Sequence, residues 1–161
     1  MRFIMVLAIG LLAAACSSSS GDKAGGSAGG AGNAVAAPGT QAHLMQETSA
    51  DRVFFDFDQH TLTAAGMDQV KRWAGWMLFN QNAKVLIEGH ADERGTRDYN
   101  LALGARRSHA VKVALESFGV SADRIETTTF GKERPAVVGS NESAWAQNRR
   151  GVIVVKAGAS S

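Results

Sequence analysis

Apolar residues recur along this chain with two different periods, one typical of strands and the other of helices. Short apolar or alternating runs predict four strands, at residues 53–58, 84–89, 125–130 and 151–155. Apolar spacings of three and four predict helices from 61–63 to 80, from 100 to 118 and from 141 to 148. This β-α-β-α-β-(α)-β order predicts the α/β class, as an α+β two-layer sandwich with the helices on one face of a mixed sheet.

The helix expected over residues 100–118 carries an arginine on its apolar side. That side reads Leu103, Arg107, Ala110 with Val111, Ala114 and Phe118. An arginine that points toward a core needs a carboxylate or a ligand, because an unpaired buried guanidinium costs several kcal/mol. Asp92, which follows the preceding strand, is the nearest candidate partner. The pair is either a structural link between helix and strand, or a receptor for a zwitterion in which Asp92 binds an ammonium group and Arg107 a carboxylate.

A second acid occupies an equivalent place in the pattern. Asp58 ends the first predicted strand as Asp92 ends the second, and open α/β sheets bind ligands at the carboxyl ends of their strands. The start of the following helix adds free N–H groups, which suit a ligand carboxylate. Asp56 and Asp58 could instead only cap the end of the strand, and the sequence leaves this choice open.

Composition and charge argue against several other kinds of site. The formal net charge is +2, which is too close to neutral for a nucleic-acid partner despite the pairs Arg106-Arg107 and Arg149-Arg150. His90, Asp92 and Glu93 lack the ligand spacing of a metal site. No serine lies in a nucleophile-elbow context. We therefore predict a binding protein with no enzymatic activity, no metal and no cofactor.

The first residues have the order of an export signal. Residues 1–15 carry one positive charge, Arg2, then an apolar run, then three small residues before Cys16. This pattern resembles a bacterial lipoprotein signal, in which the cysteine is lipidated, although Ala13 stands where leucine is usual. The alternative is an ordinary secretory signal with an incidental cysteine. Ser17 follows the cysteine in place of the aspartate of an inner-membrane retention signal, so we expect the outer membrane.

Composition divides the rest of the chain. Residues 16–50 are rich in Gly, Ser and Ala and predict a flexible tether behind the lipidated cysteine. Residues 51–157 predict one folded domain, and residues 158–161 a short tail. The chain has a single cysteine, so the domain contains no disulfide and must be held by its core.

Several motifs of the folded domain together resemble the OmpA-like peptidoglycan-binding domain. They are Phe55-Asp56-Phe57-Asp58, Glu88 to Thr96, Tyr99-Asn100, Leu103-Gly104, Arg106-Arg107, Phe130 to Val137 and Asn148 to Arg150. The likeness covers roughly residues 53–155, together with the lipoprotein signal and the tether. It implies an OmpA-like fold and a non-covalent site for the diaminopimelate residue of peptidoglycan stem peptides, whose side-chain end carries an ammonium and a carboxylate group on one carbon.

The resemblance also implies which residues bind. They are Phe57, Asp58, Asp92, Arg94, Leu103 and Arg107. Asp92 would bind the ammonium and Arg107 the carboxylate, while Arg94 would close the pocket from its loop. Asn100 is interpreted as a helix-start cap. We expect Asp92→Ala or Arg107→Ala to abolish binding to isolated cell wall and to leave the fold intact.

The partners implied by the resemblance are peptidoglycan, the outer membrane through the lipid anchor, and TolB with other Tol components. The corresponding role is to hold the outer membrane to the wall in envelope integrity and cell division. Two alternatives stay open. One is another OmpA-family wall-binding lipoprotein that does not act with the Tol proteins. The other, less favoured, is a wall hydrolase.

Overall fold

The computed structural model describes residues 35–156, so the export signal, Cys16 and most of the predicted tether lie outside the described residues. The predicted order of strands and helices is confirmed, and one further helix precedes it. The elements are α1 (Gln41–Thr48), β1 (Arg52–Phe54), α2 (Ala64–Phe79), β2 (Lys84–His90), α3 (Arg97–Ser117), a 3-10 turn (Ala122–Arg124), β3 (Ile125–Gly131), α4 (Glu142–Asn148) and β4 (Arg150–Lys156).

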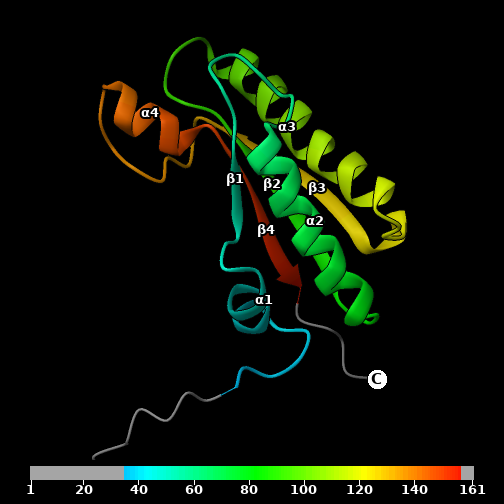
Figure 1. Cartoon of the computed structure of the whole chain (residues 1–161). Coiled ribbons are helices and arrows are strands. Elements are labelled where there is room, and N and C mark those ends of the chain that lie inside the picture. The colour runs from blue at the N-terminus through cyan, green and yellow to red at the C-terminus, as the bar shows by residue number, and fades with distance from the viewer. Residues whose placement is uncertain (1–34, 157–161) are drawn as a thin grey trace, which may run out of the picture. The chain divides into compact units, whose positions relative to one another are not determined.

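The four strands form one mixed sheet in the order β1-β4-β2-β3. β2 and β3 are parallel, while β4 runs antiparallel to both of its neighbours, β1 and β2. β1, β2 and β3 therefore end at the same edge of the sheet. Figure 1 shows α2 and α3 side by side on one face, which agrees with the predicted two-layer sandwich.

The core lies between the sheet and the two long helices. It is formed by fully or nearly fully buried side chains, including Val53, Phe55, Val70, Trp73, Met77, Val85, Ile87, Val111, Leu115, Ile125 and Ile153. The apolar spacing that predicted α2 places Val70, Trp73, Ala74 and Met77 on one side of the helix, and all four are buried. At about 25 cal/mol per Å² of apolar surface, each large side chain in this set contributes roughly 1.5–3 kcal/mol when it leaves water.

Two predicted boundaries change in ways that bear on function. The helix expected to begin within residues 61–63 is capped by Thr63, whose side chain accepts from the Gly66 N–H. α3 begins earlier than expected, because the Thr96 side chain caps it by accepting from the Tyr99 N–H. The interpretation of Asn100 as the cap is therefore wrong. The first strand ends at Phe54 rather than residue 58, because the chain turns there.

Helix α1 corrects the predicted tether, which was expected to continue to residue 50. Leu44 is completely buried in the core of the domain. The side-chain amide of Gln41 donates to the Ile153 carbonyl (3.3 Å) and accepts from the Val155 N–H (2.7 Å), so it satisfies backbone groups of β4 as a neighbouring strand would. The short helix was missed because its stability comes from these distant contacts and not from a long apolar stripe. Within residues 35–156, no helix has the length and apolar character needed to cross a bilayer.

Candidate functional site

A cleft of about 200 Å³ opens at the edge of the sheet where β1 and β2 end. Its lining residues are Phe57, Asp58, Asp92, Arg94, Gly95, Tyr99, Asn100, Leu103 and Arg107. All six residues predicted to bind are among them, so the structure brings the whole predicted set together. The cleft is built from the loop after β1, the loop after β2 and the first turns of α3. Sequence reasoning did not assign Gly95 and Tyr99 to it.

Arg107 forms the floor of this cleft and is completely buried. Its guanidinium donates to three backbone carbonyls: Nε to Gln59 (2.8 Å), Nη1 to His90 (2.8 Å) and Nη2 to Asp56 (3.2 Å). Burial lowers the pKa of Arg107 to about 10, and the nearby charge of Asp92 opposes this shift. Arg107 therefore stays protonated at neutral pH and presents a fixed positive charge to the cleft.

Asp92 is the buried acid of the cleft. Within residues 35–156 it forms no direct ion pair with Arg107, which was one of the two alternatives for these residues. The Asp92 carboxylate instead accepts from Arg94, from its backbone N–H (3.1 Å), from Nε (3.2 Å) and from Nη2 (2.7 Å). Arg149 Nη1 lies 3.5 Å from the same carboxylate. Burial acts to raise the pKa of Asp92, but the hydrogen bonds from Arg94 and the charge of Arg149 outweigh it and lower that pKa. Asp92 is therefore ionised.

Arg94 is held between two aromatic rings beside the cleft. Its guanidinium carbon lies 4.2 Å from the Phe57 ring centre and 4.0 Å from the Trp145 ring centre. Trp145 is in turn fixed by a hydrogen bond from Nε1 to Glu93 Oε1 (3.0 Å). Trp145 in α4 and Arg149, which directly follows this helix, thus supply part of the site, and neither is among the residues predicted to bind.

The remaining polar residues order the rim of the cleft. The Tyr99 hydroxyl donates to the carboxylate of Asp58, whose backbone has a left-handed φ of 58°. This hydrogen bond raises the pKa of Tyr99, because the neutral phenol is the donor. Asn100 Nδ2 donates to the Arg94 carbonyl (2.7 Å) and so fixes the loop that carries Arg94. The buried amide of Asn100 is a loop anchor.

Asp92 lies just after β2 and Arg107 lies on α3, so the separation between them depends on how closely α3 approaches β2. A Cβ atom added to Gly89 would overlap the backbone carbonyl of Gly104. A Cβ added to Gly104 would lie 2.9 Å from the Gly89 carbonyl oxygen, which is also closer than real Cβ atoms approach. Thr129 on β3 donates to the Leu101 carbonyl (3.0 Å) and fastens the same helix. Two glycines therefore set the distance at which the buried cation faces the acid.

His90 lies beside the site, on the face of the sheet opposite the helices, and is 1% exposed. Burial, together with the positive charge of Arg150, lowers the pKa of His90 to about 4. Its ring packs against Phe130 (5.5 Å between ring centres), and its Nε2 lies 3.5 Å from a Glu88 carboxylate oxygen. Among the described residues, no group of three or more His, Cys, Asp or Glu side chains could hold a metal ion.

The pKa of His90 makes the stability of the domain depend on pH. An unfolded histidine takes up a proton near pH 6.5, whereas folded His90 does so near pH 4, so the unfolded state binds more protons between these values. We expect the free energy of unfolding to be highest above about pH 6.5 and to fall by up to about 3 kcal/mol as pH decreases to about 4. In urea unfolding, the free energy of unfolding of His90→Phe should lack this pH-dependent decrease, while that of the exposed control His109→Phe should keep it. Equal pH dependence in the two variants contradicts the assignment.

The geometry of the cleft suits a small zwitterion. A fixed cation, Arg107, and an ionised acid, Asp92, face the same space from different elements, and Leu103 supplies an apolar wall. A ligand with an ammonium and a carboxylate group on one carbon can reach both charges at once, which neither a simple anion nor a simple cation can do.

Comparison with known proteins identifies the family of the chain. A family model described as "OmpA family" matches residues 54–149. A peptidoglycan-associated lipoprotein of Agrobacterium fabrum is 46% identical over 127 residues, which are 79% of this chain and 70% of that protein. One of Mesorhizobium japonicum is 40% identical over 153 residues, which are 94% and 90% of the two chains.

Solved structures show the same fold. The crystal structure of the peptidoglycan-associated lipoprotein from Burkholderia pseudomallei matches with a TM-score of 0.65 and 38% identity, over 67% of this chain and 92% of that one. The C-terminal domain of Helicobacter pylori MotB matches with a TM-score of 0.63 and 18% identity, over 68% and 87% of the two chains. At that identity, the second match supports the fold alone.

Proposed function

The chain belongs to the OmpA family and is a homologue of the peptidoglycan-associated lipoproteins, and from this premise we propose that its cleft binds the diaminopimelate residue of peptidoglycan stem peptides. These proteins bind and are not enzymes, so the wall hydrolase alternative is set aside. In the proposed complex, Arg107 binds the ligand carboxylate and Asp92 the ammonium. Phe57, Asp58 and Leu103 line the pocket, and Arg94 closes it.

The observation that carries the proposal is the pair of fixed charges in one cleft. Arg107 is held by three carbonyls and not by a carboxylate, so its positive charge is left for a ligand. Asp92, in contrast, is already bonded to Arg94. A ligand ammonium must therefore share the Asp92 carboxylate with Arg94 or displace it, and Glu142, which lies 3.9 Å from Arg94 Nη1, is placed to receive the displaced guanidinium.

The experiment for this proposal uses Asp92→Asn, which keeps the shape of the side chain and removes its charge. We expect co-sedimentation with isolated cell-wall sacculi to be lost, and binding of the unchanged protein to be competed by free diaminopimelate. Asp98→Asn is the matched control, because it removes the same charge from an exposed residue in the first turn of α3. Wild-type co-sedimentation by Asp92→Asn, or no competition by diaminopimelate, contradicts the assignment of the cleft.

We further propose that residues 1–15 are a lipoprotein signal, that Cys16 is lipidated, and that the protein is anchored in the outer membrane with its domain in the periplasm. The homology to lipoproteins supports membrane anchoring. Cys16→Ser is expected to move the protein from the membrane fraction to the soluble fraction, because three acyl chains bind a bilayer far more firmly than one. Unchanged membrane association would oppose lipidation at this residue.

The proposed cellular role is to connect the outer membrane to the wall together with the Tol proteins. What supports it is the homology over most of the chain to proteins named for their association with peptidoglycan. The alternative, a wall-binding lipoprotein that acts without the Tol proteins, predicts the same cleft chemistry. A pull-down with purified TolB separates the two, since only the first binds it.

A further inference from the structure

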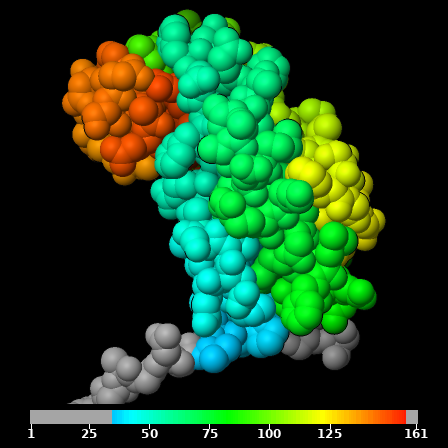
Figure 2. All heavy atoms as spheres, viewed as in Figure 1, coloured from blue at the N-terminus to red at the C-terminus, as the bar shows by residue number. Residues whose placement is uncertain are grey.

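A larger hollow, of about 500 Å³, lies away from the cleft, along the outer edge of β1. Its floor is β1 and the residues that follow, one wall is the first half of α2, and the other wall is α4. In Figure 2 the surface is hollowed beneath α4 (orange), beside the cyan and green residues of β1 and α2. The walls are low because three of the residues along them are small: Ala65, Gly66 and Ala146. We call this hollow the β1 groove.

The floor of the β1 groove offers backbone groups for pairing. Within the part of the chain that the structure describes, β1 is an edge strand that pairs with β4 alone. The Ile153 N–H donates to the Asp51 carbonyl (2.8 Å), and the Phe55 N–H donates to the Arg149 carbonyl (2.9 Å), so the odd-numbered residues face β4. The N–H and carbonyl groups of Arg52 and Phe54 must then point away from the sheet. Within residues 35–156, no hydrogen bond reaches these groups.

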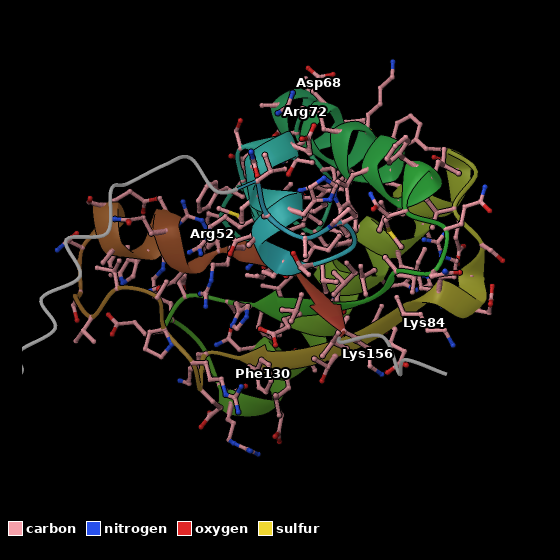
Figure 3. The ribbon with its side chains drawn as sticks, turned by 90° about the horizontal axis from the view of Figure 1, so that it is seen from below. Arg52, Asp68, Arg72, Lys84, Phe130 and Lys156 are labelled. Carbon is pink, nitrogen blue, oxygen red and sulfur yellow. The ribbon has the colours of Figure 1, made fainter. Side chains whose placement is uncertain are left out.

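The charge of the β1 groove is positive where α2 borders it. The Arg72 guanidinium is positioned by Gln69 Oε1, which accepts from Arg72 Nε (2.9 Å) and from Nη2. Gln69 is itself held, since its Nε2 donates to the Ala50 carbonyl (3.0 Å). No carboxylate lies within ion-pair distance of Arg72 among the described residues. Arg52, which is labelled with Arg72 in Figure 3, adds a second cation from β1 that is partly offset by Asp51.

We propose that the β1 groove is a docking site for an extended, acidic segment of a partner protein, which adds to the sheet as a fifth strand beside β1. Main-chain hydrogen bonds to Arg52 and Phe54 give such a complex its affinity, and side-chain pockets give it specificity. The side chains of alternate residues enter the β1 groove over Ala65 and Gly66. An acidic residue of the segment faces Arg72, which forms no ion pair within residues 35–156, although Asp68 lies one turn away on α2.

The test uses the full chain with Cys16→Ser and two acetylated peptides of about eight residues, which is the usual length of a strand. Both alternate valine with threonine; one carries glutamate at its third and seventh positions and the other carries lysine. Titration is followed through the backbone amide signals in nuclear magnetic resonance spectra. We expect the glutamate peptide to shift the amides of Arg52 and Phe54, and the lysine peptide to bind at least about fivefold more weakly.

Two variants of one residue separate backbone pairing from side-chain contact. Both variants lose the Phe54 ring. Phe54→Pro also loses an N–H that points away from β4, which an edge strand tolerates, whereas Phe54→Ala keeps that N–H. We expect Phe54→Ala to bind the glutamate peptide and Phe54→Pro to lose at least about fivefold in affinity. Arg72→Ala should remove the preference for glutamate over lysine.

Three results would overturn the proposal: equal binding by Phe54→Pro and Phe54→Ala, equal binding of the two peptides, or no amide shift from either peptide at millimolar concentration. None of these outcomes touches the cleft, because the β1 groove is tested without peptidoglycan. Failure here leaves the proposed wall binding as it stands, and failure of the sacculus experiment leaves the β1 groove untouched.

Discussion

Arg107→Leu is expected to abolish sacculus binding and to lower the free energy of unfolding by about 3 kcal/mol. The substitution removes the cation of the cleft and leaves the carbonyls of Asp56, Gln59 and His90 without their donors. These carbonyls belong to the loop after β1 and to the end of β2, so the side chain proposed to bind the ligand also holds the walls of the cleft together. Co-sedimentation measures the first effect and urea unfolding the second.

From the sequence, loss of Arg107 was expected to leave the fold intact. The three hydrogen bonds from Arg107 to backbone carbonyls reverse this expectation. Arg107→Lys separates charge from geometry, because lysine keeps the positive charge but cannot reach three carbonyls with a planar fork. We expect it to bind weakly and to recover part of the stability. Arg106→Leu, an exposed neighbour on the same helix, is the control and should match the unchanged protein in stability. A stability change below about 1 kcal/mol for Arg107→Leu would contradict the structural role.

The second large effect is expected from Gly89→Ala. The added methyl group would overlap the Gly104 carbonyl, and both partners are backbone, so neither can rotate away. Helix α3 must then move from β2, at a cost of about 3 kcal/mol or more. Arg107 moves with the helix while Asp92 stays with the strand, so binding to sacculi should weaken together with the fold.

The control for Gly89→Ala is Gly75→Ala on α2. A Cβ at Gly75 meets nothing within 4 Å, and alanine in the interior of a helix is favoured over glycine by up to about 1 kcal/mol. The same chemical change should therefore stabilise the domain at one glycine and destabilise it at the other. Urea unfolding of the two variants checks the signs, and a neutral effect of Gly89→Ala would mean that α3 and β2 are less closely packed than described.

The sequence predicted those parts of the fold that depend on local pattern. The apolar stripe of α2 follows from spacing, and the helix begins after Thr63, within the range of residues 61–63 that the sequence indicated. The cleft could also be located, because ligand sites of open sheets lie where strands end, and two predicted strands ended in acids. The start of α3 was misplaced because Asn100 was taken as its cap, whereas the side chain that caps the helix is that of Thr96, four residues earlier.

The partners of each charged side chain could not be predicted, because they come from segments far apart in the chain. Asp92 was expected to pair with Arg107, the cation nearest in topology, but pairs with Arg94 and lies near Arg149. Trp145 reaches Arg94 across about half of the domain's sequence. The periodicity of α4 predicts a short helix, yet contains no signal that its tryptophan stacks on a guanidinium.

Helix α1 has a mechanical consequence. It attaches beside the C-terminal half of β4, where Gln41 bonds to Ile153 and Val155. In Figure 1 this end of the domain is opposite the edge at which β1 and β2 end, where the cleft lies. A pull between an anchor before residue 35 and a ligand in the cleft runs along the strands. The hydrogen bonds between β4 and β2 lie across that direction. All of them therefore oppose the sliding of one strand past the other at the same time, and they are not broken one after another. Such a pull thus loads the sheet in shear, in which many hydrogen bonds must break together before the strands separate.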